Sequence, residues 1–374
     1  MENPFRYGET VTGKYFTNRK KEIRDIKNTI KSAQNMFIYS SRRMGKTSLL
    51  KTVIELLKKD HSIVPVYVDL QRAASAGQFV EIYSAAISRA FITKEAKIKK
   101  AGSFFKRIVP SFEIAEDGKL RFSFDFSKTS KGVEKAIEEV YEIPQKIAVK
   151  YKKRVVVVFD EFQEISQYDG AAFEKKLRSF IQHHDKVCYI FMGSKTHIIL
   201  DMFKNPHRAF YQSAKIYPLF AIPQKDLEKF IIERFKSTGR QITKELACKI
   251  VRMVRQSPYH LQQLCSTIWL AGKNKIKEVD MQTALDNIMR TQNELFYSWY
   301  DSVSMHQRAV LGALPQERGI FSNDVRLKYN LGSSSTVQAS VGALVKKNFI
   351  VKDGNQYRLF DPFFEMWLIK NISG

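Results

Sequence analysis

The sequence contains few cysteines and no long apolar run. Its three cysteines, Cys188, Cys248 and Cys265, are widely separated and match no metal-binding spacing. We therefore expect buried, reduced thiols. No stretch of about 18 consecutive apolar residues is present, which argues against a membrane-spanning helix. The first residues, MENPFRYGET, lack the apolar segment of a secretory signal. These absences together favour a cytoplasmic protein.

Acidic residues are too few to balance the basic ones. The chain has 62 Lys and Arg against 38 Asp and Glu, a formal net charge of +24. A field of this sign attracts polyanions, most often nucleic acid, although a lysine-rich solvated surface gives the same balance. The 374 residues allow two or three packed units, and a hydrophobic content of 44% indicates a folded globular protein.

Short apolar runs alternate with helical patterns up to about residue 220. The runs predict strands at 35–40, 62–70, 154–162 and 187–194. The first, third and fourth are near-continuous in hydrophobicity, as expected of strands buried on both faces of a parallel sheet. Alternation of this kind is typical of an α/β fold. Residues 110–127 interrupt this alternation of elements. Apolar and polar residues alternate there with a period of two on both sides of Asp117-Gly118, which predicts an inserted β-hairpin. We therefore expect an α/β core over 1–220.

Two further regions follow this core. Residues 221–292 are helical throughout and predict a small lid domain packed on its neighbour. Residues 293–374 have the order helix, helix, helix, hairpin, which is that of a winged helix-turn-helix. Ser304 can cap the first of these helices, and Asn323 or Asp324 the second.

The stretch FIYSSRRMGKTSLL (37–50) predicts a phosphate-binding loop. An apolar strand leads into Gly45-Lys46-Thr47, which opens a helix, so backbone N–H groups can form an anion nest. Lys46 would reach the β- and γ-phosphates and Thr47 would bind Mg²⁺. Ser40 replaces the first glycine of the pattern and fits if φ is negative there. The residues expected to line the nucleotide are Ser41, Arg42, Arg43, Met44, Gly45, Lys46, Thr47 and Ser48, with Arg42 and Arg43 facing either the phosphates or solvent.

A second motif, VVVVFDEFQEI (155–165), ends an apolar strand in two carboxylates. Asp160 fits the residue that holds Mg²⁺, and Glu161 fits the base that orients the attacking water. Alone, two acids closing a strand are common, but after a GKT loop the functional interpretation is favoured. Ser194, at the end of the next strand, can sense the γ-phosphate; the alternative is a plain strand-to-loop turn.

These motifs, in the order FTNRKKEI, SSRRMGKTSLL, VVVVFDEFQEI, FMGS and SPYHLQQLC before a winged helix, resemble the archaeal-type ATPases. That family belongs to the signal-transduction (STAND) branch of the AAA+-related P-loop NTPases and is similar in layout to origin-recognition proteins. The resemblance implies ATP and Mg²⁺ as cofactors. It implies an adenine-side box at Phe16, Asn18 and Arg19, with Asn18 in place of glycine, and an adenine contact from Pro258 and Tyr259, although Tyr259 can equally be core packing.

One expected group of the family is missing. The family frequently has a Leu-Tyr-Gly-Arg stretch after the sensor strand, and this chain has AFYQSAK (209–215) instead. Arg208 is a nearby substitute for the arginine that stabilises phosphate charge, or a surface arginine. Because an arginine of this kind, called an arginine finger, raises the rate of hydrolysis by roughly 10³–10⁵, we expect slow turnover by the isolated chain.

The winged helix predicts contact with DNA or with protein. At its third helix, side chains that can reach phosphates or base edges are Ser333, Ser334, Ser335, Thr336 and Gln338, and the flanking backbone contacts would be Lys346, Lys347, Lys352 and Arg358. The favoured hypothesis is an ATP-driven switch that controls DNA binding or partner assembly. The alternatives are a DNA-binding regulator that holds nucleotide with little turnover, and a signalling or defence scaffold that forms homo-oligomers on ATP.

Overall fold

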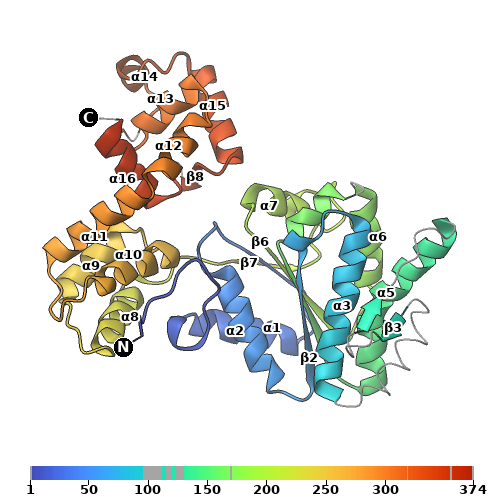
Figure 1. Ribbon diagram of the computed structural model, residues 1–374. Coiled ribbons are helices and arrows are strands. Elements are labelled where there is room, and N and C mark those ends of the chain that lie inside the picture. The colour runs from blue at the N-terminus through green and yellow to red at the C-terminus, as the bar shows by residue number, and fades with distance from the viewer. Residues whose placement is uncertain are drawn as a thin grey trace. The chain divides into compact units, whose positions relative to one another are not determined.

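The computed structural model describes residues 2–95, 112–114, 120–122, 130–168, 171–317, 319–353 and 356–372. The chain forms two compact units, coloured along the chain in Figure 1, and each is described by itself. The first unit consists of residues 10–221. The second joins residues 222–374 with the N-terminal residues through Glu9.

Within the described residues, the first unit is built on a sheet of five parallel strands in the order β2-β5-β6-β1-β7. The strands are β1 (Met36–Tyr39), β2 (Ile63–Asp69), β5 (Arg154–Asp160), β6 (Val187–Gly193) and β7 (Lys215–Pro218). The first four confirm the predicted strands. The sequence does not predict β7, because this edge strand has four residues, is largely exposed and ends in proline.

Helices cover both faces of this sheet, as the near-continuous apolar strands predict. On β5, Val155, Val157 and Phe159 join one buried cluster, while Val156 and Val158 join another. The first cluster is completed by α3 (Ala76–Glu95), α5 (Ser130–Tyr151), α6 (Ala171–Ile181) and α7 (Thr196–Lys204), and the second by α1 (Lys20–Lys31) and α2 (Lys46–Lys58) (Figure 1). The sheet is therefore buried on both sides, and its strand ends are left to carry polar groups.

A separate strand pair is present where the sequence predicts the inserted hairpin. β3 (Phe112–Ile114) and β4 (Leu120–Phe122) pair antiparallel, with Phe112 opposite Phe122. The predicted turn at Asp117-Gly118 lies outside the described residues.

The second unit is mainly helical. Its first helices are α8 (Gln224–Lys236), α9 (Lys244–Met253), α10 (Pro258–Leu270) and α11 (Glu278–Thr291), called here the helical segment. They are followed by α12 (Asn293–Asp301), α13 (Met305–Ala313), α14 (Asn323–Lys328), α15 (Ser334–Lys346), β8 (Ile350–Asp353), β9 (Gln356–Leu359) and α16 (Pro362–Asn371). The order from α13 to β9 confirms the predicted winged helix.

The helix starts in this unit show which caps the sequence identifies correctly. Ser304 and Gln307 form a reciprocal capping box at the start of α13, as predicted for Ser304. The prediction that Asn323 or Asp324 caps α14 is wrong. The helix already begins at Asn323, and Ser322 precedes it without a side-chain hydrogen bond to the first turn.

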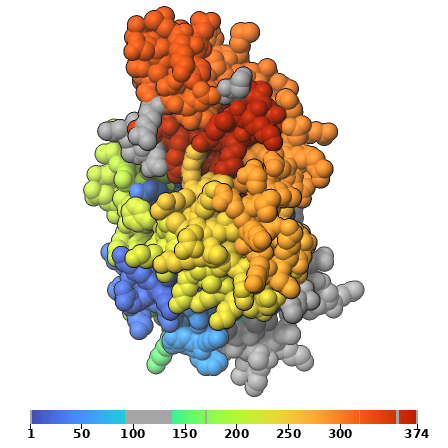
Figure 2. Space-filling model, turned by 90° about the vertical axis from the view of Figure 1, so that its left-hand side faces the viewer, coloured from blue at the N-terminus to red at the C-terminus, as the bar shows by residue number. Residues whose placement is uncertain are grey.

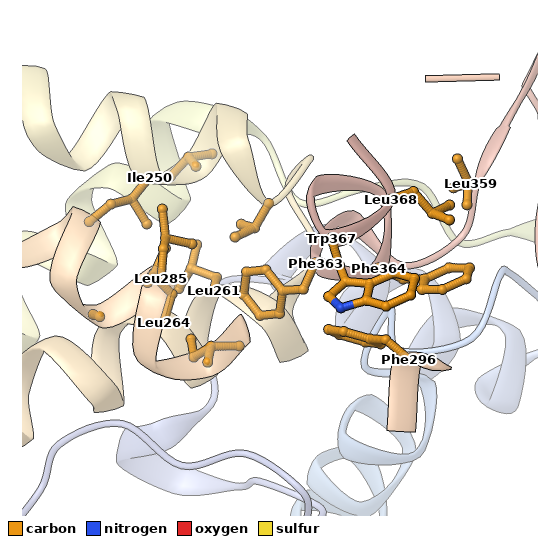
Figure 3. Packing of buried hydrophobic residues seen from close by; sticks show 14 of the residues in the cluster. Ile250, Leu261, Leu264, Leu285, Phe296, Leu359, Phe363, Phe364, Trp367 and Leu368 are labelled. Carbon is orange, nitrogen blue, oxygen red and sulfur yellow. The ribbon is translucent and has the colours of Figure 1, made fainter. Parts of the chain in front are cut away.

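One buried apolar cluster runs through the whole second unit. Figure 3 shows Leu261 and Leu264 of α10 beside Phe363 of α16, and Trp367 of α16 beside Phe296 of α12. The helical segment and the winged helix therefore share a core instead of each enclosing its own.

The structure bears on two expectations from the sequence, those for the cysteines and for a membrane-spanning helix. Cys188 and Cys265 are buried, whereas Cys248 is only partly buried, so the expectation of three buried thiols holds for two of them. Within the described ranges, no helix combines the length and apolar character needed to cross a membrane.

Candidate nucleotide-binding site

The loop between β1 and α2 has a backbone suited to binding phosphate. It lies at the carboxyl edge of the sheet and leads into a helix that begins at Lys46. Gly45 has φ +80° and Arg43 has φ +60°, both in the left-handed region. Ser40, at the position of the pattern's first glycine, is not among the described residues with positive φ. Serine therefore fits there without backbone strain, whereas Gly45 meets a real conformational need.

The Lys46 side chain folds back over this loop. Its Nζ donates to the carbonyl oxygens of Ser40 at 2.9 Å and Ser41 at 2.8 Å, and lies 3.2 Å from Ser40 Oγ. Burial lowers the pKa of Lys46 to about 8, opposed by the nearby Glu161 and Asp160 carboxylates. A buried ammonium beside backbone N–H groups is a strong site for phosphate oxygens, which can replace the carbonyls as acceptors.

Asp160 closes β5 directly beside the loop. Its Oδ2 accepts hydrogen bonds from Thr47 Oγ1 at 3.1 Å and from the Tyr67 hydroxyl at 2.6 Å, and its Oδ1 accepts from the Glu161 N–H at 2.9 Å. Burial raises the pKa of Asp160 to about 6, and the Tyr67 hydrogen bond works in the opposite direction. A hydroxyl and a carboxylate this close are the hard oxygen donors that Mg²⁺ prefers, so Thr47 and Asp160 fit the ion.

Tyr67 is a site residue that the sequence does not predict. It reaches Asp160 because β2 pairs with β5 in a register that places Asp69 opposite Asp160. Burial and the Asp160 carboxylate raise the pKa of Tyr67 well above its usual range, so the phenol stays a donor. In the sequence, the one sign of such a role is the hydroxyl of Tyr67 in an otherwise mostly apolar strand.

Glu161 is held by three donors from neighbouring residues. Its Oε2 accepts from Ser194 Oγ at 2.8 Å, from the Ser194 N–H at 3.1 Å and from Gln163 Nε2 at 2.6 Å. Its backbone is left-handed, with φ +53°. Ser194 thus contacts this carboxylate at the junction where β6 runs beside β5, and its predicted role in sensing a γ-phosphate stays a prediction. Three donors on one oxygen fix the orientation of the carboxylate.

Gln163 is the second site residue missing from the sequence prediction. It lies in the short 3-10 helix η3 (Phe162–Gln167), and its buried Oε1 has no hydrogen-bond partner among the described residues. A Cβ at Gly193 would lie 2.2 Å from this Oε1 and 2.4 Å from Ile199 Cδ1. The glycine before Ser194 therefore allows the close approach of Gln163.

The predicted adenine-side box has an unusual backbone. Asn18, which replaces the family's glycine, has φ +52°, and Arg19 follows with φ +66°. Asparagine tolerates this left-handed conformation better than most residues, which explains why it can stand there. Phe16 is half-buried and packs against the cluster that covers α1 and α2.

Arg19 faces the protein rather than a ligand. Its guanidinium is buried and donates to Glu22 at 2.7 Å, to the Phe220 carbonyl at 2.6 Å and to the Met44 carbonyl at 3.2 Å. Arg19 therefore ties the box to the phosphate-binding loop through Met44, and its contact with the nucleotide stays a prediction.

The other predicted loop residues differ in exposure. Arg42 is exposed, whereas Ser41 and Arg43 are half-buried. Ser48 is buried, and its Oγ accepts a hydrogen bond from the Val11 N–H at 3.1 Å. Ser48 therefore anchors the segment around Val11, and its contact with the nucleotide stays a prediction.

Arg208 does not present a free positive charge. Its Nη1 donates to Asp201 Oδ2 at 2.7 Å, and its other nitrogens bind both carboxylate oxygens of the buried Glu174. Two carboxylates neutralise one guanidinium, so Arg208 forms structural ion pairs here, and its catalytic role stays a prediction.

The remaining predicted residues belong to the second unit. Pro258 and Tyr259 open α10, and the Tyr259 ring lies edge-on to Tyr7, 6.0 Å between centroids. On the winged helix, Ser333 caps α15 by accepting from the Thr336 N–H at 3.2 Å. The exposed members of the predicted DNA-contacting set are Ser333, Ser334, Ser335, Gln338, Lys346, Lys347 and Lys352, and the half-buried ones are Thr336 and Arg358.

Known proteins match both parts of the chain. The family described as "ATPase domain predominantly from Archaea" matches residues 16–264, and that described as "Probable winged helix domain" matches residues 294–370. An uncharacterized ATP-binding protein of Methanocaldococcus jannaschii is 27% identical over 154 residues. That match spans 40% of this chain and only 38% of the relative.

Solved structures share the fold over nearly the whole chain. A Walker-type ATPase of Pyrococcus abyssi has a TM-score of 0.65 at 17% identity, covering 95% of this chain and 96% of that one. The Aeropyrum pernix ORC2 protein, in ADPNP–ADP complexes, has a TM-score of 0.56 at 13% identity and covers 98% of each chain. The parallel sheet, the paired GKT and DE motifs and the family match over residues 16–264 agree, and the chain belongs to the family of ATPases found predominantly in Archaea, with a winged helix at its C-terminal side.

Proposed function

We propose that this chain is a Mg²⁺-dependent ATPase whose nucleotide state controls DNA binding or partner assembly through the winged helix. One observation carries the proposal. Three kinds of group come together at adjoining strand ends. Lys46 places an ammonium on a phosphate-type loop, and Thr47 and Asp160 form a hydroxyl–carboxylate pair beside it. Glu161 supplies a second carboxylate, which is held separately. The phosphate-binding, metal-holding and water-orienting groups of a phosphoryl-transfer site are therefore represented.

The roles follow from these contacts. Thr47 and Asp160 would hold Mg²⁺, which supplies neutralisation of phosphate charge when bound. Lys46 would bind phosphate oxygens. Glu161 has one oxygen saturated by Ser194 and Gln163, so its remaining oxygen is the one that can orient a water for attack. We expect turnover of the isolated chain to be slow, because the ion pairs of Arg208 withhold its charge.

Two variants and one control test the enzyme. Lys46→Ala should lose nucleotide affinity, and Glu161→Gln should retain affinity but lose about 10²–10⁴ in turnover. Glu164→Gln is the matched control, since Glu164 lies on η3, which directly follows Glu161, pairs with Lys195 at the start of α7, and as glutamine keeps an oxygen for its contact with Gln163. Phosphate release with and without Mg²⁺ gives the rates. Parent-like turnover of both test variants would exclude this site.

The DNA half of the proposal is supported by charge and exposure. The chain carries +24, and Lys346, Lys347 and Lys352 are exposed at the end of α15 and on β8. Shift assays over a salt series should show affinity falling steeply. Replacing Lys346 and Lys347 by alanine should reduce the salt slope by about 2. A double alanine variant of Lys229 and Lys249, with the same charge change on the helical segment, is the control.

Nucleotide dependence separates the proposed switch from its alternatives. A switch requires different DNA affinities with ATP and ADP, because a ligand shifts an equilibrium only by its differential affinity. Equal affinities would indicate a regulator that merely holds nucleotide. Absence of DNA binding at low salt, together with growth in light scattering on a non-hydrolysable ATP analogue, would indicate an assembling scaffold.

A further inference from the structure

A small cavity lies in the first unit, at the amino edge of its parallel sheet. Its volume is about 270 Å³. Ile63 begins β2 and Arg154 begins β5, and the sheet register places these two lining residues opposite each other. The phosphate-binding loop and Asp160 lie at the carboxyl ends of their strands. The cavity is therefore at the opposite edge of the sheet from the candidate nucleotide site.

The ends of two helices supply the apolar wall of this cavity. Ile30 of α1 and Leu57 of α2 line it together with Ile63, and all three belong to the buried cluster on that face of the sheet. In Figure 2 blue atoms of the region around α1 and α2 lie next to lighter blue atoms of the region around β2, and these elements are in contact. A short apolar group can therefore be shielded from water here.

Basic side chains line the same cavity. Lys27 and Lys31 are one helical turn apart on one face of α1, and Arg154 lines the cavity with them. The acidic residue in the described lining is Asp60, whose Oδ1 accepts from the Ser62 N–H at 2.9 Å and from Ser62 Oγ at 2.6 Å. In the described part of the chain, none of the three basic side chains forms an ion pair. The cavity therefore has an excess of positive charge.

Arg154 has an unmet need for a hydrogen-bond acceptor. Its Nη1 is buried and has no hydrogen-bond partner within the described ranges. The backbone N–H of Arg154 donates to the Ser62 carbonyl at 2.9 Å, so the start of β5 is already fixed and the need comes from the side chain. A buried charged donor without an acceptor is costly, and an oxyanion with paired oxygens suits the planar guanidinium.

We propose that this cavity binds a small organic phosphate monoester. The Arg154 guanidinium and the two lysine ammoniums would hold the dianionic phosphate, and the apolar wall would contact a short carbon chain. A volume of about 270 Å³ lies just below the roughly 300–1,000 Å³ of sites for drug-sized ligands, so it suits a phosphate with a few carbon atoms better than a nucleotide. The proposal does not depend on ATP hydrolysis.

Calorimetric titration of the full chain with butyl phosphate tests the proposal. At pH 8 this monoester is a dianion, because its second pKa is about 6. The titrated chain carries Lys46→Ala, which removes the main phosphate-binding group of the nucleotide site. Binding should persist in this variant, and adding Arg154→Met, which keeps an apolar side chain but no donor, should weaken it at least tenfold. Dimethyl phosphate, a diester with a single charge, should bind at least tenfold more weakly than butyl phosphate.

A second pair of substitutions tests the lysines without altering the core. Lys27 and Lys31 are exposed, so Lys27→Gln with Lys31→Gln should fold as the parent does and weaken butyl phosphate binding at least tenfold. This pair keeps the test decisive where Arg154→Met reduces stability. The matched control is Lys20→Gln with Lys51→Gln, the same charge change at exposed positions of α1 and α2 outside the lining. At about 0.15 M salt, where distant charges are screened, its affinity should stay within twofold of the parent.

Vesicles distinguish two sources of the monoester. Sedimentation of the chain with phosphatidylcholine vesicles only when they contain phosphatidic acid, lost in Arg154→Met, would assign a lipid headgroup; no sedimentation would assign a free phosphate ester. The inference would be overturned by absence of butyl phosphate binding, by equal binding of the diester, by unchanged affinity in the lysine pair, or by an equal effect of the control pair. Loss of all binding in Lys46→Ala alone would place the phosphate in the nucleotide site, which overturns this inference and leaves the proposed function intact.

Discussion

The approach of Gln163 to Gly193 makes a quantitative prediction for Gly193→Ala. The new Cβ would lie 2.2 Å from Gln163 Oε1 and 2.4 Å from Ile199 Cδ1, so these atoms must retreat by about 1 Å to reach ordinary contact. Overpacking of this kind costs about 1–3 kcal/mol. Movement of Gln163 also disturbs its 2.6 Å hydrogen bond to Glu161. A catalytic group displaced by about 1 Å can lose roughly 10² in rate.

We therefore expect Gly193→Ala to unfold at lower denaturant concentration and to hydrolyse ATP about 10²-fold more slowly, while still binding it. Urea unfolding, phosphate release and calorimetric titration measure the three quantities. Gly312→Ala is the control, because a Cβ there meets nothing within 4 Å in α13. It should leave turnover unchanged and stabilise by about 0.5–1 kcal/mol. If Gly193→Ala matched the parent in both stability and turnover, Gln163 would not fix Glu161.

Three further predictions address other parts of the chain. Cys248 should react with a disulfide reagent at pH 8, whereas Cys188 and Cys265 should react only on unfolding. Burial raises the pKa of Cys188 to about 12 and that of Cys265 further, so raising the pH from 8 to 9 should not convert either thiol to its thiolate. Ser304→Ala removes the capping box of α13 and should cost about 1 kcal/mol in urea unfolding, whereas parent-like stability would show that the cap contributes nothing. Arg208→Gln should lose about 1–3 kcal/mol of stability, because Glu174 stays buried without its partner, and Glu174→Gln in the same chain should restore part of it. A 10³-fold loss of turnover at unchanged stability would instead restore Arg208 as a finger.

The elements that the sequence predicts are those whose pattern depends on the local chain. The runs that form β1, β5 and β6 are near-continuous in hydrophobicity because both faces of each strand are covered. β7 lies at the edge of the sheet, so its residues are exposed and leave no such run. α16 is not predicted from the sequence either, although Asp361-Pro362 is a recognisable helix start. Its residues are apolar on several sides, because it packs between two parts of the unit.

The residues of the candidate site also fall into two groups, those that the sequence predicts and those that it does not. Lys46, Thr47, Asp160 and Glu161 are predictable because the partners proposed for them are phosphate, metal and water, whose chemistry demands fixed residue types at fixed spacing. Tyr67 and Gln163 are not, because their partner is a carboxylate brought near by strand register and by the turn after β5.

Arginine shows the same limit from the other side. Arg19 and Arg208 have the charge that a nucleotide site uses, and the family pattern directs attention to such residues. In the structure Arg19 binds Glu22 and two carbonyls, and Arg208 binds two carboxylates. A guanidinium satisfies a protein carboxylate as well as it satisfies a phosphate, because both present paired oxygens to its planar donors. Sequence position can therefore locate an arginine near a site, but only the acceptors around it decide whether its charge is available to a ligand.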